Sequence, residues 1–128
     1  MQVTRIKVNN INSNYSIIIG KDVLKQIPSR IKTLCPLAKK IILIVDKKIP
    51  KKYKYKLKNI LNKYEIYIFE YSVSEKFKSF ENVNKLVEKC LSYNLNRSDI
   101  LISFGGGIIG DLGAFAASII KRGINFIN

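Results

Sequence analysis

The stretch Asp99-Ile-Leu-Ile-Ser-Phe104, Gly105-Gly-Gly-Ile-Ile-Gly-Asp111, followed by residues 112–122, decides the fold of this chain. Its first part is a short apolar run closed by glycines, which predicts a buried strand over 99–104. Its last part predicts a helix over 112–122, because two basic residues stand in its last turn and apolar residues recur at helical spacing. The apolar positions are Leu112, Phe115, Ala116, Ile119 and Ile120.

The turn between strand and helix carries Gly105, Gly107 and Gly110 at G-x-G-x-x-G spacing. Glycines permit a positive φ and a close approach of the backbone to a ligand. A helix that begins just after such a turn presents free N–H groups and a partial positive charge, so we predict a phosphate-binding site. The alternative is a glycine-rich connection that binds nothing. No acidic residue follows Asp111, whereas the common dinucleotide fingerprint has one about 20 residues further on.

Strands and helices alternate from about residue 40, which predicts an α/β fold with a Rossmann-like parallel sheet flanked by helices. An N-terminal β-hairpin over 3–8 and 15–19 precedes it, followed by a helix to about residue 34 that Asp22 caps. The further expected elements are strands over 40–45, 65–71 and 99–104, helices over 50–63 and 80–93, and the start of a strand at 124–127. Ligands of such sheets bind beyond the carboxyl ends of the strands, where Asp46, the 73–78 loop and the glycine turn all fall.

Composition limits the classes of function. The 128 residues suit one globular domain, with 47% hydrophobic and 25% charged residues. The chain has no apolar run long enough to span a bilayer and no apolar signal core, which predicts a cytoplasmic protein without a membrane partner. Cys35 and Cys90 are expected in helices, as buried and unpaired thiols. No histidine is present, which removes the usual general base and the commonest metal ligand.

The net charge of +14 raises the hypothesis of a nucleic-acid-binding domain. The basic residues concentrate between Lys21 and Lys63, where Asp22 and Asp46 are the only acids. Lys, Asn and Ile are enriched together, so a compositional bias is the alternative explanation. The basic run lacks exposed interleaved aromatics and a recognition-helix motif, and we therefore do not expect nucleic acid as the partner.

Residues Gly105-Gly-Gly-Ile-Ile-Gly-Asp-Leu112, with Phe115-Ala-Ala117 and Arg122-Gly-Ile-Asn-Phe-Ile127 behind them, resemble the 3-dehydroquinate synthase family. Segments 15–20 and 75–78 also resemble this family, although their motifs are less specific to it. The resemblance implies a lyase of the shikimate pathway, which serves aromatic amino acid biosynthesis. With NAD it converts 3-deoxy-D-arabino-heptulosonate 7-phosphate to 3-dehydroquinate and phosphate. Related sugar-phosphate cyclases and NAD-dependent polyol dehydrogenases are alternatives, of which the glycine run favours the cyclases.

Asp46 is expected one residue past a buried strand, where its carboxylate suits the hydroxyls of a ribose and repels a 2′-phosphate, which favours NAD over NADP. A cap for the turn 47–50 is the alternative. By resemblance, Arg122 reaches across a homodimer interface to the phosphate of a sugar-phosphate substrate. The resemblance also implies a set of cofactor-binding residues: Asp46, Val73, Ser74, Glu75, Lys76, Phe77, Lys78, Gly106, Gly107, Ile108, Ile109, Gly110 and Asp111.

The family binds a divalent metal, zinc or cobalt, through one Glu and two His of a following helical domain that is absent here. The resemblance therefore implies no catalytic and no metal-binding residue in this chain. It implies a single NAD-binding domain over 1–128, truncated relative to the family and inactive alone. Ala114 stands where the family commonly has glycine, with Gly113 just before it, and Val73-Ser74 replaces its usual Asp-Gly.

Overall fold

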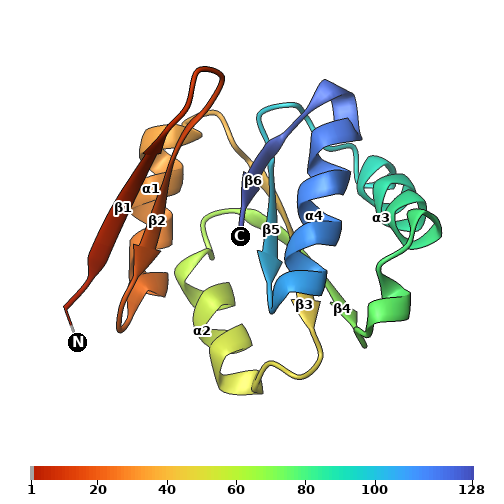
Figure 1. Cartoon of the computed structure of the whole chain (residues 1–128), viewed down its shortest axis with the longest axis horizontal. Coiled ribbons are helices and arrows are strands. Elements are labelled where there is room, and N and C mark those ends of the chain that lie inside the picture. The colour runs from red at the N-terminus through yellow and green to blue at the C-terminus, as the bar shows by residue number, and fades with distance from the viewer. Residues whose placement is uncertain (1) are drawn as a thin grey trace.

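The computed structural model describes residues 2–128 and contains two sheets (Figure 1). Strands β1 (Thr4–Asn9) and β2 (Asn14–Ile19) form an antiparallel hairpin at one side of the molecule. The larger sheet is entirely parallel, with the strand order β4-β3-β5-β6. Its strands are β3 (Lys40–Asp46), β4 (Glu65–Tyr71), β5 (Ile100–Phe104) and β6 (Asn125–Ile127). The α/β fold, the hairpin and the terminal strand are confirmed.

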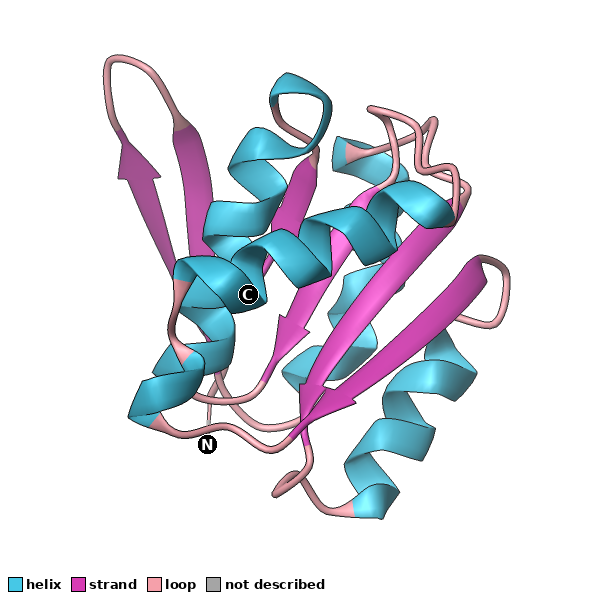
Figure 2. Ribbon diagram, turned by 90° about the vertical axis from the view of Figure 1, so that its right-hand side faces the viewer, coloured by secondary structure: helices cyan, strands magenta, loops and turns pink. Residues whose placement is uncertain are grey.

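Helices cover both faces of the parallel sheet (Figure 2). One face holds α1 (Ile27–Leu34) and α2 (Lys51–Ile60), and the other holds α3 (Phe80–Ser92) and α4 (Gly107–Ile119). Three single turns of 3-10 helix complete the chain: η1 (Val23–Gln26), η2 (Glu75–Phe77) and η3 (Ile120–Arg122).

Strand β3 forms the centre of both cores. Ile42 and Ile44 belong to the core beneath α3 and α4, whereas Ile41, Leu43 and Val45 belong to the core beneath α1 and α2. All five side chains are fully buried. A continuous apolar run is typical of a parallel strand that is covered on both faces, because successive side chains point to opposite sides.

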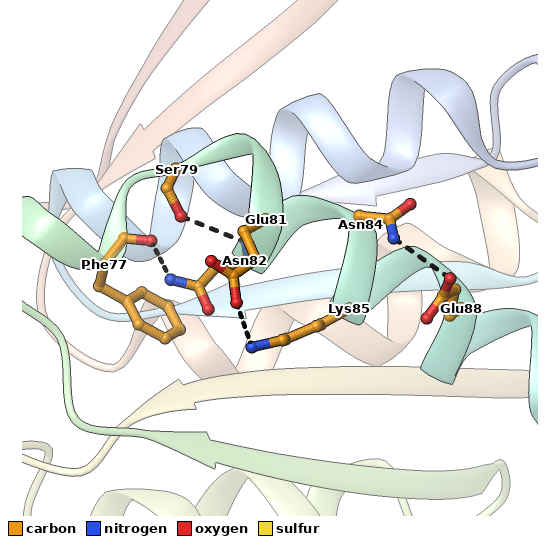
Figure 3. Close-up of polar contacts among 7 residues, drawn as sticks. All are labelled: Phe77, Ser79, Glu81, Asn82, Asn84, Lys85 and Glu88. Carbon is orange, nitrogen blue, oxygen red and sulfur yellow. Dashed lines mark hydrogen bonds and ion pairs between the residues drawn. The ribbon is translucent and has the colours of Figure 1, made fainter.

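The start of α3 fixes where the preceding loop leaves the sheet (Figure 3). Ser79 caps the helix, since its Oγ accepts a hydrogen bond from the Asn82 backbone N–H at 3.3 Å. The Asn82 side-chain amide donates to the Phe77 carbonyl at 2.8 Å, so it ties the helix to the loop instead of closing a capping box. Pairs such as Glu81 with Lys85, at 2.6 Å, lie on the exposed side of the helix.

Two predictions about the α1 region are wrong. Asp22 does not cap a helix; it has a left-handed backbone with φ of 60°, and its carboxylate contacts the Lys56 ammonium at 2.6 Å. The α-helix begins only at Ile27, because Pro28 suits a first helical turn. Cys35 follows this helix and is half-buried, whereas Cys90 lies within α3, where burial raises the pKa of its thiol to about 12.

A buried carboxylate joins two strands at their amino-terminal ends, away from the carboxyl ends of the sheet. Asp99 is fully buried and accepts hydrogen bonds from the backbone N–H groups of Lys39, Lys40 and Asn96 at 3.0, 2.9 and 2.7 Å. A buried carboxylate is tolerated when such donors satisfy it. Asp99 therefore fixes the starts of β3 and β5 against each other.

Helix α4 lies close to the sheet at Gly113. A Cβ atom added there would come within 2.0 Å of Ser103 Oγ and 2.9 Å of Ile44 Cδ1. Ala114 is exposed, so the glycine that the helix needs for packing is Gly113. Absence of a side chain at this position sets the distance between α4 and the sheet.

We predict that Gly113→Ala lowers the free energy of unfolding by about 1–3 kcal/mol, because the added methyl overpacks the core. Urea denaturation followed by circular dichroism measures this loss. Gly107→Ala is the matched control in the same helix, since a Cβ there meets no atom within 4 Å. Equal urea midpoints for the two variants would show that α4 is not held at this distance.

Candidate functional site

The carboxyl ends of β3 and β5 form the point where the chain changes direction across the sheet. From β3 the chain continues to β4 on one side, and after α3 it returns to β5 on the other side of β3. Ligands of open parallel sheets bind in the crevice at such a point. The structure has a pocket of about 320 Å³ there, which we call the switch-point pocket. It is lined by Asp46, Lys48, Val73, Ser74, Gly106, Gly107, Ile108 and Ile109.

The glycine turn is shorter than predicted, because α4 begins at Gly107 and not at residue 112. Gly106 is its extended N-cap, and the Gly110 N–H already donates to the Gly106 carbonyl at 3.0 Å. The first N–H groups of the helix have no partner within it and open into the pocket region. The predicted helix N-terminus is thus present, five residues earlier in the chain.

The turn does not use the positive φ that its glycines permit, since the glycines with positive φ among the described residues are Gly20 and Gly123. What the turn requires is space. A Cβ on Gly106 or Gly107 would meet no atom within 4 Å, whereas one on Gly105 would lie 3.0 Å from the Asp46 Cβ. The open side of Gly106 and Gly107 leaves room for a ligand to approach the backbone.

The sequence left open whether Asp46 caps the turn 47–50 or faces a ligand, and its position allows both. Its Oδ1 accepts the Lys48 backbone N–H at 2.9 Å, so it caps the turn, and its side chain also lines the switch-point pocket. The residue is 8% exposed. One carboxylate oxygen is therefore engaged in the turn, and the second is free to accept a hydrogen bond from a ligand.

Lys78 and Asp111 are brought together from the loop after β4 and from α4. The Lys78 ammonium contacts Asp111 Oδ2 at 2.6 Å, and this hydrogen bond and the carboxylate charge raise the pKa of Lys78. Asp111 stands inside α4 and not in a turn before a helix over 112–122, so its predicted place is wrong. The pair borders a second groove of about 360 Å³, whose apolar wall includes Phe80 and Phe115.

The remaining predicted cofactor residues lie outside the lining of the switch-point pocket. Glu75 and Lys76 are exposed, and the Phe77 ring packs against Tyr71 with centroids 5.1 Å apart. Gly110 is buried, and a Cβ there would lie 3.0 Å from the Asn128 side chain. Their binding role stays a prediction.

Arg122 lies at the opposite end of α4 from the pocket. The helix has 13 residues and is about 20 Å long. Lys121 and Arg122 have φ angles of 48° and 64°, a left-handed conformation that costs non-glycine residues energy. Within one chain, the structure does not bring Arg122 to the pocket.

Sequence reasoning missed Lys48, which lines the pocket two residues after Asp46. The expectation that the basic run has no exposed aromatics is wrong, since Tyr53 and Tyr55 are 42% and 64% exposed. Over residues 2–128 the structure contains no cluster of three or more metal-ligating side chains. No helix within the same range is long and apolar enough to cross a bilayer.

Comparisons with known proteins identify relatives of the chain. A family model described as 3-dehydroquinate synthase N-terminal matches residues 68–128. The chain is 39% identical to the 3-dehydroquinate synthase of Pelagibacter ubique over 128 residues, all of this chain and 35% of the relative. It is 39% identical to the enzyme of Clostridium botulinum over 116 residues, which cover 89% of this chain and 33% of the relative. The chain thus spans about a third of the length of these relatives.

A solved structure of similar fold is that of 2-deoxy-scyllo-inosose synthase complexed with carbaglucose-6-phosphate, NAD+ and Co2+. The TM-score is 0.84 at 22% identity, and the match covers 96% of this chain and 34% of that protein. The likeness supports the fold described above.

We predict that Lys78 reacts slowly with an amine-acylating reagent near pH 9, because its raised pKa keeps the ammonium protonated. Mass spectrometry after limited acylation measures the rate at this residue. In Asp111→Asn the charge partner is lost, and Lys78 should react faster. An unchanged Lys78 rate in that variant would contradict the ion pair.

Proposed function

We propose that this chain, a relative of the 3-dehydroquinate synthases, is the NAD-binding N-terminal part of such an enzyme. The whole enzyme would convert 3-deoxy-D-arabino-heptulosonate 7-phosphate to 3-dehydroquinate and phosphate. The observation that carries this proposal is the switch-point pocket, where the open side of Gly106 and Gly107 meets the carboxylate of Asp46. The family match supplies the reaction class.

The residues of the pocket fit a dinucleotide. The free N–H groups at the start of α4 suit the diphosphate, because the helix N-terminus carries a partial positive charge. The unengaged oxygen of Asp46 suits a ribose hydroxyl. Lys78 and Asp111 would contact the far portion of the cofactor, where the ion pair holds the two side chains in place. When bound, NAD would supply a hydride acceptor for the substrate alcohol.

A catalytic metal does not fit this chain. It contains no histidine, and residues 2–128 hold no cluster of metal-ligating side chains. Zinc or cobalt would need ligands from another part of the enzyme. We further propose that Arg122 serves the substrate phosphate of a second copy in a homodimer. Its distance from the pocket and its left-handed backbone favour a role outside its own site.

The decisive experiment is titration of the chain with NAD+ by calorimetry. We predict that Gly107→Val raises the Kd at least about tenfold, because the side chain fills the space beside the helix N-terminus. The fold should persist, since a Cβ there meets no atom within 4 Å. Ala114→Val, an exposed position of the same helix, is the control and should bind as the parent does. Equal affinities for the parent and Gly107→Val would refute the assignment.

A second candidate function is the binding of single-stranded nucleic acid through α2. The exposed ring of Tyr55 is flanked at helical spacing by Lys51, Lys52 and Lys58, and residues 47–64 contain no acid. Lysines and an exposed ring are what a sequence-independent binder uses.

For this alternative we expect oligonucleotide affinity to fall steeply with salt. Fluorescence anisotropy with a labelled oligonucleotide measures it, and Tyr55→Ala should weaken binding more than Tyr15→Ala in the hairpin. Absence of binding at about 150 mM salt would exclude the role.

A further inference from the structure

Ser103, in β5, carries a buried hydroxyl group outside the lining of the switch-point pocket. It is 4% exposed, and its Oγ donates a hydrogen bond to the Ile109 carbonyl at 3.1 Å. Residues 2–128 contain two other buried polar side chains, Asp46 and Asp99, and both accept backbone N–H groups. Ser103 is different, because it reaches from the sheet to the backbone of a helix. A buried hydroxyl is costly unless it is hydrogen-bonded, so this contact holds the two elements together.

The glycine at position 113 makes this contact possible. A Cβ on Gly113 would lie 2.0 Å from Ser103 Oγ, so the hydroxyl occupies the space that a side chain at 113 would need. Glycine is less favourable than alanine inside a helix. Its presence in the middle of α4 leaves room for the Ser103 hydroxyl to reach the helix backbone.

The hydrogen bond acts on the first turn of α4 through a single peptide group. The Ile109 carbonyl shares its peptide with the Gly110 N–H, which donates to the Gly106 carbonyl at 3.0 Å. Hydrogen bonds at the two ends of one peptide polarise it and strengthen each other. Gly106 is the N-cap of α4, and both Gly106 and Ile109 line the switch-point pocket. The buried hydroxyl is therefore linked to the residue from which the free N–H groups of the helix begin.

We propose that Ser103 is a positioning residue for the diphosphate of the nucleotide. Through the Ile109–Gly110 peptide, its hydroxyl fixes the first turn of α4, so that the free N–H groups are already oriented toward the switch-point pocket. Donors that are held in place before binding need no ordering when the anion arrives, which improves affinity. Without the hydroxyl the turn stays helical but is held less firmly. The inference rests on the proposed function, since the nucleotide is its ligand.

The test compares variants of the whole chain by calorimetric titration with NAD+ and by the amide resonance of Gly110 in the ligand-free protein. Ser103→Ala should raise the NAD+ Kd about three- to tenfold, the range expected for one hydrogen bond. It should also move the Gly110 amide proton upfield, because the peptide loses polarisation. Ser118→Ala is the matched control, since Ser118 Oγ donates to the Phe115 carbonyl at 2.7 Å on the exposed side of the same helix. This control should leave the Kd and the resonance unchanged.

A double variant separates positioning from packing. Ser103→Ala combined with Gly113→Ala removes the hydroxyl and gives its space to the new methyl group. The other close neighbours of that methyl are the ends of the Ile44 and Leu101 side chains, at 2.9 and 3.1 Å, which can shift. The urea midpoint should therefore lie above that of Gly113→Ala alone, while the NAD+ Kd stays at least about threefold above the parent value.

Equal NAD+ affinities for the parent and Ser103→Ala would overturn the positioning role and spare the proposed function. So would a double variant that regains the parent's affinity, because packing alone would then explain the loss. Failure of the parent to bind NAD+ overturns both.

Discussion

Burial of β3 on both faces is the constraint on which the structure depends. Five consecutive side chains, Ile41 to Val45, have no exposed surface, so helices must cover the sheet on each side. Helical connections between parallel strands then bring every carboxyl end to one edge. Asp46 is the first polar residue after the apolar run, and it therefore stands at that edge beside the start of α4.

The position of α4 turns this edge into a pocket. Gly113 lets the helix approach the sheet, and the buried Ser103 hydroxyl donates to the Ile109 carbonyl at 3.1 Å within the first turns of the helix. The Ser103 contact lies near the start of α4 and Gly113 lies at its middle, so together they set how the helix and its free N–H groups lie against the sheet. Gly106 and Gly107 have no side chains, so the backbone at the start of α4 stays accessible to a ligand.

Polar contacts around the pocket join segments that are distant in sequence. The Lys78–Asp111 pair links the loop after β4 to α4, and the Ser79 cap with Asn82 fixes the end of the same loop. Asp46 holds the turn that carries Lys48. The turn after β3 and the loop after β4 are thus each held by polar contacts of their own. Arg122, at the other end of α4, has no part in this assembly within one chain.

The sequence by itself determined the strands, the hairpin and two helices, predicted over 50–63 and 80–93 and observed over 51–60 and 80–92, because these follow from local apolar patterns. It also determined that Asp46, the 73–78 loop and the glycine turn lie at the carboxyl ends of the strands, where the pocket is. Tertiary structure decided what local pattern leaves open. Close packing against Ser103 and Ile44 requires a glycine at position 113. Helix α4 starts at Gly107, and the glycines of the turn have no positive φ. Lys48 lines the pocket only because of how the turn after β3 folds. The sequence around it is rich in lysine, so nothing in the local pattern distinguishes Lys48 from its neighbours.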